Sequence, residues 1–252
     1  MKIFWFILIQ FFLIHLAQAE VLFEGYYKVS QFKKHIGFYI LKTEVDSKNN
    51  RFKTTSFLKL SKNGFNMTES LTANSTTDFT PVDYSYLATD GTKSKTIDIT
   101  FKNDMMTGLI SENGEKKKIS KKLPKGTFLS SSLYYMMMKS KDGLKTGTKF
   151  EFSAIAEEMA DIAKGSSSID KKMTSRGVLQ LLKVDNSFAG MDYENMITQQ
   201  GQTISSNTKA TGLETELVKN KEEALQDIKI SSGTLEKIFG NIPEGKNNIL
   251  NN

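Results

Sequence analysis

Turn signals recur along this chain between short alternating stretches, and this pattern constrains the fold more than any other feature of the sequence. Asn63-Gly64, Asp90-Gly91 and Asn113-Gly114 each separate short stretches in which apolar and polar residues alternate. Alternation with a period of two is typical of a half-buried strand, and these dipeptides favour the tight turns of hairpins. The sequence therefore predicts a mainly β protein, an antiparallel meander that forms an open or flattened barrel or a curved sheet.

The stretch from Arg176 to Val218 holds the closing part of this meander. Val178 to Val184 is apolar on both faces, which predicts a central strand that is covered on both sides. Phe188-Ala189-Gly190 and Gln200-Gly201 provide the turns between the strands that follow. The stretch carries no catalytic signature.

One inserted helix is expected near 128–139, because apolar side chains recur there at helical spacing. The segment 154–164 is ambiguous: its Ala and Glu residues favour a helix, whereas its surroundings favour a strand and a hairpin that closes at Gly165. We predict the strand. Residues 20–230 are expected to form a single antiparallel β domain, followed over 231–252 by a short helical turn and a mobile tail.

Residues 1–19 have the pattern of a cleaved export signal. Lys2 is followed by an almost purely apolar run from Ile3 to Leu16, and Ala17-Gln18-Ala19 is a small-x-small cleavage site. A membrane anchor is the alternative, but the run is shorter than the about 20 residues that span a bilayer. The sequence therefore predicts a periplasmic or secreted protein without an integral membrane segment in the mature chain.

Lysine dominates the charge of the chain, which is +6 at neutral pH. The dense basic stretch is Lys116-Lys117-Lys118 with Lys121-Lys122. Two interpretations fit it: a patch that binds anionic lipid or polymer, and a solvated hairpin whose charges keep a sheet edge from pairing with another chain. We favour the second. No nucleic-acid partner is expected, because lysines and acids are interspersed along the sequence.

Catalytic residue types are scarce in this sequence. There is no cysteine, and His35 is the one histidine beyond the export signal. A cysteine nucleophile, a Ser-His-Asp triad and the usual zinc site are therefore not expected. Ser56 and Lys59 fit S-x-x-K, and Lys145-Thr146-Gly147 fits K-T-G, but this enzyme pattern needs a helix where we predict a strand. The sequence predicts no cofactor and no metal.

The remaining catalytic alternative is a hydrolase that acts on an envelope polymer through a pair of carboxylates. Glu157 and Asp161 are the best available pair, with Glu158 beside them. Adjacent strand residues face opposite ways, and no tryptophan remains beyond the export signal to stack on a sugar. A solvated acidic face explains these residues better.

The preferred hypothesis is a non-catalytic cell-envelope module that binds an apolar ligand, such as a lipid, or an envelope protein in the concavity of its sheet. The candidate lining residues are aromatic side chains with polar neighbours in sequence and two methionines of the expected helix: Phe52, Tyr84, Tyr86, Met136, Met137, Phe150, Phe152 and Tyr193. The alternative is that they form ordinary core, because every sheet must bury a face and methionine is a common core filler.

Two sets of glycine and aromatic motifs, one in each half of the chain, stand in a characteristic order. Glu24-Gly25-Tyr26-Tyr27 precedes Ile36-Gly37-Phe38-Tyr39, and Phe188-Ala189-Gly190 precedes Gln200-Gly201. This order resembles the exported bacterial β-modules of the DUF3108 type, and the likeness covers nearly the whole mature chain.

The resemblance implies an open antiparallel barrel or curved sheet, related in shape to lipoprotein carriers. A similar module precedes transglutaminase-like domains in some envelope proteins. The resemblance brings no catalytic residues, and no transglutaminase-like activity is expected of this chain.

Overall fold

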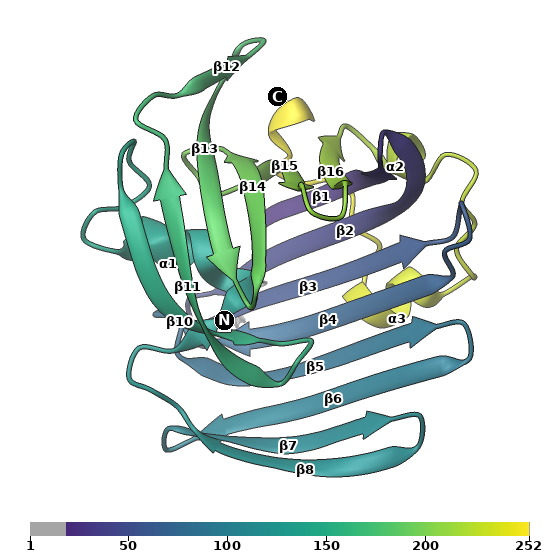
Figure 1. Cartoon of the computed structure of the whole chain (residues 1–252), viewed down its shortest axis with the longest axis vertical. Coiled ribbons are helices and arrows are strands. Elements are labelled where there is room, and N and C mark those ends of the chain that lie inside the picture. Colours follow the sequence, from purple (N-terminus) through teal and green to yellow (C-terminus); the bar gives the residue numbers. More distant parts are fainter. Residues whose placement is uncertain (1–18, 252) are drawn as a thin grey trace, which may run out of the picture.

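The computed structural model describes residues 19–251. The export signal expected at residues 1–19 therefore lies outside the described residues, apart from Ala19. The described residues form one large sheet of sixteen strands, in the order β8-β7-β6-β5-β4-β3-β2-β1-β16-β15-β14-β13-β11-β10-β9, with β12 paired to β13 (Figure 1). The two ends of this order, β8 and β9, do not pair with each other, so the sheet is open.

The first half of the chain is a meander in which each strand pairs antiparallel with the next. Its turns follow the sequence signals: Asn113 and Gly114 have φ of 51° and 91°, the left-handed values that a tight hairpin requires. The strands are β1 (Glu20–Gln31), β2 (Lys34–Asp46), β3 (Arg51–Leu60), β4 (Met67–Ser75), β5 (Pro81–Asp90), β6 (Lys93–Lys102), β7 (Met105–Glu112) and β8 (Glu115–Lys122).

The second half folds back across the first half in Figure 1 and ends beside β1. β9 and β10 are parallel, and every other strand pair among the described residues is antiparallel. The last strand, β16, pairs with β1 from Tyr26↔Val218 to Gln31↔Leu213. The elements are β9 (Phe128–Leu129), η1 (Ser130–Ser132), α1 (Leu133–Lys139), β10 (Lys149–Ala156), β11 (Asp161–Ile169), β12 (Thr174–Arg176), β13 (Leu179–Phe188), β14 (Met191–Ile197), β15 (Thr203–Thr208), β16 (Leu213–Val218), α2 (Lys221–Leu225), α3 (Thr234–Phe239) and η2 (Ile249–Asn251).

Strands β1 to β3 bury both of their faces. Tyr26, Phe38 and Phe57 pack against residues of α2 and α3, among them Ala224 and Phe239. Since neighbouring strand residues point to opposite faces, Tyr27 and Tyr39 face the other way, and they are partners in the β1–β2 register. The C-terminal helices thus cover the outer face of these strands and leave the inner face toward the second half of the sheet.

The inner space between the two halves holds two further clusters of buried side chains. One lies under β4 to β8 and includes Tyr84, Ile97 and Met106. The other joins α1, through Leu133 and Met137, to the strands of the second half. Between these clusters the packing leaves room for the cavity described below.

The predicted fold class is confirmed: the protein is mainly β, the sheet is antiparallel apart from β9–β10, and a short helical insertion occupies 130–139. The segment 154–164 is strand, turn and strand, as predicted, with β10 paired to β11. The predicted central strand is wrong at its start. Val178 lies in the β12–β13 turn and is 97% exposed, whereas Leu181 and Leu182 are buried. Gly177, with φ of 59°, allows this turn.

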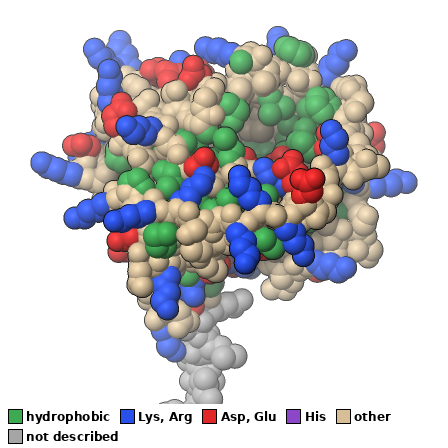
Figure 2. All heavy atoms as spheres, turned by 60° about the horizontal axis from the view of Figure 1, so that its bottom comes forward, with side chains coloured by type: hydrophobic (Ala, Val, Ile, Leu, Met, Phe, Trp, Pro, Cys, Tyr) green, Lys and Arg blue, Asp and Glu red, His purple; other side chains and the backbone are tan. Residues whose placement is uncertain are grey.

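The lysine-rich stretch forms β8, an edge strand of the sheet. Ile119 points into the core, and Lys116, Lys117 and Lys118 are exposed. Figure 2, in which the bottom of Figure 1 comes forward, shows Lys and Arg side chains with Asp and Glu side chains among them. This placement is consistent with lysines that keep an edge strand from pairing with another chain.

The segment after α3 lies along β1. Glu24 is buried, and its carboxylate accepts hydrogen bonds from the backbone N–H groups of Glu244 (2.8 Å) and Lys246 (3.3 Å). The Tyr26 hydroxyl donates to the Pro243 carbonyl (2.8 Å). The mobility expected of this tail stays a prediction, and any motion has to break these bonds.

Candidate functional site

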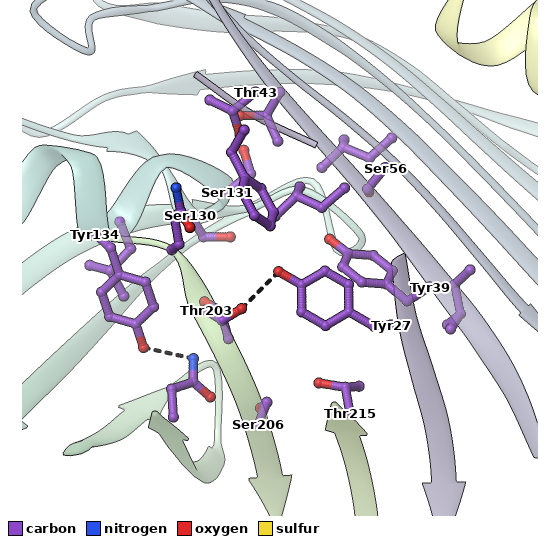
Figure 3. A pocket seen from close by; sticks show the side chains of 18 of the residues that line it. Tyr27, Tyr39, Thr43, Ser56, Ser130, Ser131, Tyr134, Thr203, Ser206 and Thr215 are labelled. Carbon is purple, nitrogen blue, oxygen red and sulfur yellow. Dashed lines mark hydrogen bonds between the residues drawn. The ribbon is translucent and has the colours of Figure 1, made fainter. Parts of the chain in front are cut away.

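A partly enclosed cavity of about 390 Å³ lies between the inner face of β1 to β4, the strands β14 to β16, and the segment of η1 and α1 (Figure 3). The strand register explains the composition of its wall. Tyr27, Tyr39 and Leu58 are successive partners across β1, β2 and β3, and Leu41, Ser56 and Leu71 are successive partners across β2, β3 and β4. Side chains at successive partner positions share one face of a sheet, so both rows point into the same space.

Apolar side chains form much of the wall: Phe23, Val29, Leu41, Leu58, Leu60, Met67, Leu71, Leu133 and Leu213. Their grouping follows from strand alternation. Each is two or four residues from another cavity-lining residue of the same strand, except Leu133, which lies on the helix α1 that closes one side. This wall suits an apolar molecule.

Hydroxyl and amide groups interrupt the apolar wall. Figure 3 shows Tyr27 and Tyr39 side by side, with Ser206 and Thr215 on the strands opposite. The Tyr27 hydroxyl donates to the Thr203 carbonyl oxygen (2.9 Å). The Tyr134 hydroxyl oxygen accepts hydrogen bonds from the side-chain amides of Asn195 (2.7 Å) and Asn186 (3.1 Å). The hydroxyl and amide groups of Tyr27, Tyr134 and Asn195 place polar atoms at defined points of an otherwise apolar space.

The described wall carries no formal charge. None of its residues is Asp, Glu, Lys, Arg or His. Burial raises the pKa of the Tyr39 and Tyr135 phenols to about 12, and that of the Tyr27 phenol well above its usual value. These tyrosines are therefore neutral at physiological pH.

One carboxylate lies just behind this wall. Glu157 is buried and accepts hydrogen bonds from the Ser130 hydroxyl (2.5 Å) and the Ser131 backbone N–H (3.1 Å). Burial raises its pKa, and these hydrogen bonds oppose the rise. Glu157 thus holds η1 in place, and two of the three serines of η1, Ser130 and Ser131, line the cavity.

A second hollow of about 630 Å³ adjoins the cavity and shares Tyr135 and Gln202 with it. The Tyr135 ring packs edge-on against Phe52, with 5.2 Å between ring centroids. The Lys139 ammonium lies 5.4 Å from the centre of the Phe79 ring, on the same hollow. Tyr135 and Gln202 therefore stand between the inner cavity and this outer hollow.

The candidate lining residues from the sequence fall in different places. Tyr193 lines the inner cavity, and Phe52 lines the outer hollow. Tyr84 and Tyr86 belong to the core under β4 to β8. The four others pack in or against the cluster around α1: Met136, Met137, Phe150 and Phe152. The structure thus brings two of the eight to a hollow.

The carboxylate pair considered from the sequence is divided between two environments. Glu157 is buried behind η1, whereas Asp161 is exposed and forms an ion pair with Lys121 (2.7 Å). That ammonium lowers the pKa of Asp161, opposite to the shift of Glu157. Neither residue lines the cavity. Within the described residues, no group of three or more His, Cys, Asp or Glu side chains is placed to hold a metal ion.

Sequence reasoning missed the main polar residues of the cavity. Tyr27 and Tyr39 escaped because they lie in strands that are apolar on both faces, where no alternation marks the inner side. Asn195, and Asn186 behind the wall, did leave a signal, because asparagine is disfavoured inside strands and both are buried in strand interiors. An asparagine in a buried strand needs a hydrogen-bond partner, and both side-chain amides donate to the Tyr134 hydroxyl oxygen.

The fold and the cavity together define an open antiparallel β-sheet protein with an uncharged inner hollow. The profile of the family described as "Protein of unknown function (DUF3108)" matches residues 23–195. The match covers more than half of the chain, which therefore belongs to the DUF3108 family; this confirms the resemblance seen in the sequence. The association with transglutaminase-like domains is not confirmed.

None of the curated proteins matches the chain. A crystal structure of a DUF1089 family protein from Pseudomonas aeruginosa is similar with a TM-score of 0.37 and 10% sequence identity, over 69% of this chain and 90% of that chain. A likeness at this level carries no argument about function. Over residues 19–251, no helix has the length and apolar character needed to cross a membrane.

Proposed function

We propose that this protein is a non-catalytic module that binds an apolar, uncharged ligand in the cavity between β1–β4 and β14–β16. The observation that supports it is a cavity of about 390 Å³ with an apolar wall and neutral hydroxyl and amide groups. Small-molecule sites have volumes of about 300–1,000 Å³ and this kind of lining. A charged ligand group would be buried here without a counter-charge, which costs several kcal/mol.

The export pattern of residues 1–19 supports a periplasmic or extracellular site of action. An apolar molecule in such a compartment needs to be shielded from water, and a cavity of this kind supplies the shield. The role proposed is therefore to hold or carry an apolar molecule of the cell envelope.

The test is native mass spectrometry of the protein purified from the compartment to which it is exported, followed by organic extraction. We expect a bound molecule that extraction releases. A variant with a filled cavity, Ser206→Phe, should lose it, because Ser206 points into the cavity.

Ser205→Phe is the matched control, because Ser205 pairs with Glu216 and faces the opposite side of β15. It should keep the ligand. If the wild-type protein carries no extra mass and binds no fluorescent apolar probe, the proposal is wrong.

A further inference from the structure

Two carbonyl oxygens of the cavity lack a hydrogen-bond partner. Five buried side-chain polar atoms are unpartnered among the described residues, and two of these, Asn195 Oδ1 and Gln202 Oε1, belong to residues of the cavity wall. Both atoms are acceptors and cannot donate. A buried acceptor without a partner costs about 1–3 kcal/mol, so both oxygens favour a ligand that donates a hydrogen bond.

The surroundings of Asn195 determine which of its atoms is free. Asn186 is oriented by two bonds: its Oδ1 accepts from the Ser167 hydroxyl (2.7 Å), and its Nδ2 donates to the Val184 carbonyl (3.2 Å). The same Nδ2 also donates to the Tyr134 oxygen. Asn195 gives its own Nδ2 to that oxygen, the bond drawn at Tyr134 in Figure 3, and this leaves Oδ1 free. Asn195 is 7% exposed, so bulk water has little access to it.

Gln202 places the second free oxygen where the cavity meets the outer hollow. Its Nε2 donates to the Asn247 carbonyl (3.0 Å), and its backbone N–H donates to the Thr198 hydroxyl (3.2 Å). These two bonds hold the residue against the tail segment and the β14–β15 turn. Its Oε1 has no hydrogen-bond partner, and Gln202 lines both hollows.

We propose that the ligand is an uncharged lipid with a free hydroxyl group, such as a long-chain alcohol or an acylglycerol, and that this hydroxyl donates to Asn195 Oδ1. This inference rests on the proposed function and names its ligand class. The absence of any cation in the described wall disfavours a fatty-acid carboxylate or a phosphate, because either would be buried unpaired. In this arrangement the apolar wall contacts the hydrocarbon chain of the lipid, and Asn195 Oδ1 accepts the hydrogen bond of its hydroxyl group.

The experiment compares three probes of equal chain length on the delipidated wild-type protein: dodecanol, dodecyl methyl ether and dodecanoate. Binding is measured by displacement of a fluorescent apolar probe. Dodecanol should bind about tenfold more tightly than the ether, because the ether cannot donate and one hydrogen bond of this kind is worth about a factor of ten. Dodecanoate should bind more weakly than both.

Asn195→Leu should remove the preference for alcohol over ether while the ether still binds, because leucine keeps the volume and loses the acceptor. Gln202→Leu is the second variant; it should retain the preference, since the hydroxyl is assigned to Asn195. If Asn195→Leu does not fold, the three-probe series on the wild-type protein tests the preference for a hydroxyl donor, and loss of that preference in Gln202→Leu would refute the assignment to Asn195.

The outcomes separate the two proposals. Equal binding of alcohol and ether by the wild-type protein, or a preference that survives Asn195→Leu, overturns the assignment of the hydroxyl and leaves the cavity as an apolar site. Failure of all three probes to displace a bound fluorescent probe overturns the proposed ligand class, whereas a protein that carries no extra mass and does not bind the fluorescent probe overturns the proposed function itself.

Discussion

Leu182→Asp and Val178→Asp provide a sharp test of the fold, because the two residues lie in one apolar stretch of sequence and in opposite environments. Leu182 is 1% exposed on β13, between β14 and the strands on its other side, and packs in the cluster around α1. Val178 is 97% exposed in the turn before that strand. The same substitution should therefore unfold the protein at one position and leave it unchanged at the other.

The cost at Leu182 has two parts. Removal of a buried leucine side chain costs about 2–5 kcal/mol. A carboxyl in the same place must be desolvated, and a pKa shift of about 3–5 units corresponds to about 4–7 kcal/mol near neutral pH. Together these reach about 6–12 kcal/mol, which is comparable to the whole stability of a typical domain, about 5–15 kcal/mol. Val178→Asp should change stability by less than about 0.5 kcal/mol.

The assay is thermal and urea unfolding followed by circular dichroism, with Leu182→Ala as an intermediate variant. We expect no cooperative transition for Leu182→Asp, a shift of about 2–5 kcal/mol for Leu182→Ala, and the wild-type curve for Val178→Asp. A wild-type melt for Leu182→Asp would refute the placement of β13 in the interior of the sheet.

Two further predictions concern buried carboxylates. Glu24→Ala should lower the free energy of unfolding in urea by about 3 kcal/mol and speed hydrogen exchange at Glu244 and Lys246, because each bond to a charged acceptor is worth about 1.5–3 kcal/mol. Glu24→Gln, which keeps an acceptor, should lose less. Unchanged exchange in Glu24→Ala would show that Glu24 does not hold the C-terminal segment against β1. The raised pKa of Glu157 means that the folded protein binds its proton more tightly, so the stabilising contribution is complete below the unfolded pKa, near 4.5, and is lost as pH rises through the folded pKa. Glu157→Gln should flatten this fall of Tm with pH, and an unaltered pH profile would show that Glu157 does not cause it.

Local sequence was enough to predict the strands and most of their turns. Asn113-Gly114 and Ala189-Gly190 both adopt left-handed φ in hairpins, as short-range chemistry requires. The same local reasoning failed at Val178, because a valine beside an apolar run fits the start of a buried strand as well as an exposed turn before it. Gly177 marked the turn, and its effect on the next residue depended on the pairing of β12 with β13, which the sequence did not indicate.

The cavity could not be predicted in the same way. The sequence determined that β1 to β3 carry apolar and aromatic residues on both faces, with Tyr26 and Tyr27 adjacent. Only the tertiary structure decided which face became the wall of a cavity. It did so by pairing β16 with β1, across nearly the whole length of the chain, and by placing α2 and α3 over the Tyr26 face. Strand alternation sorts residues into two faces but does not say what covers each of them, and here that depended on contacts between segments far apart in sequence.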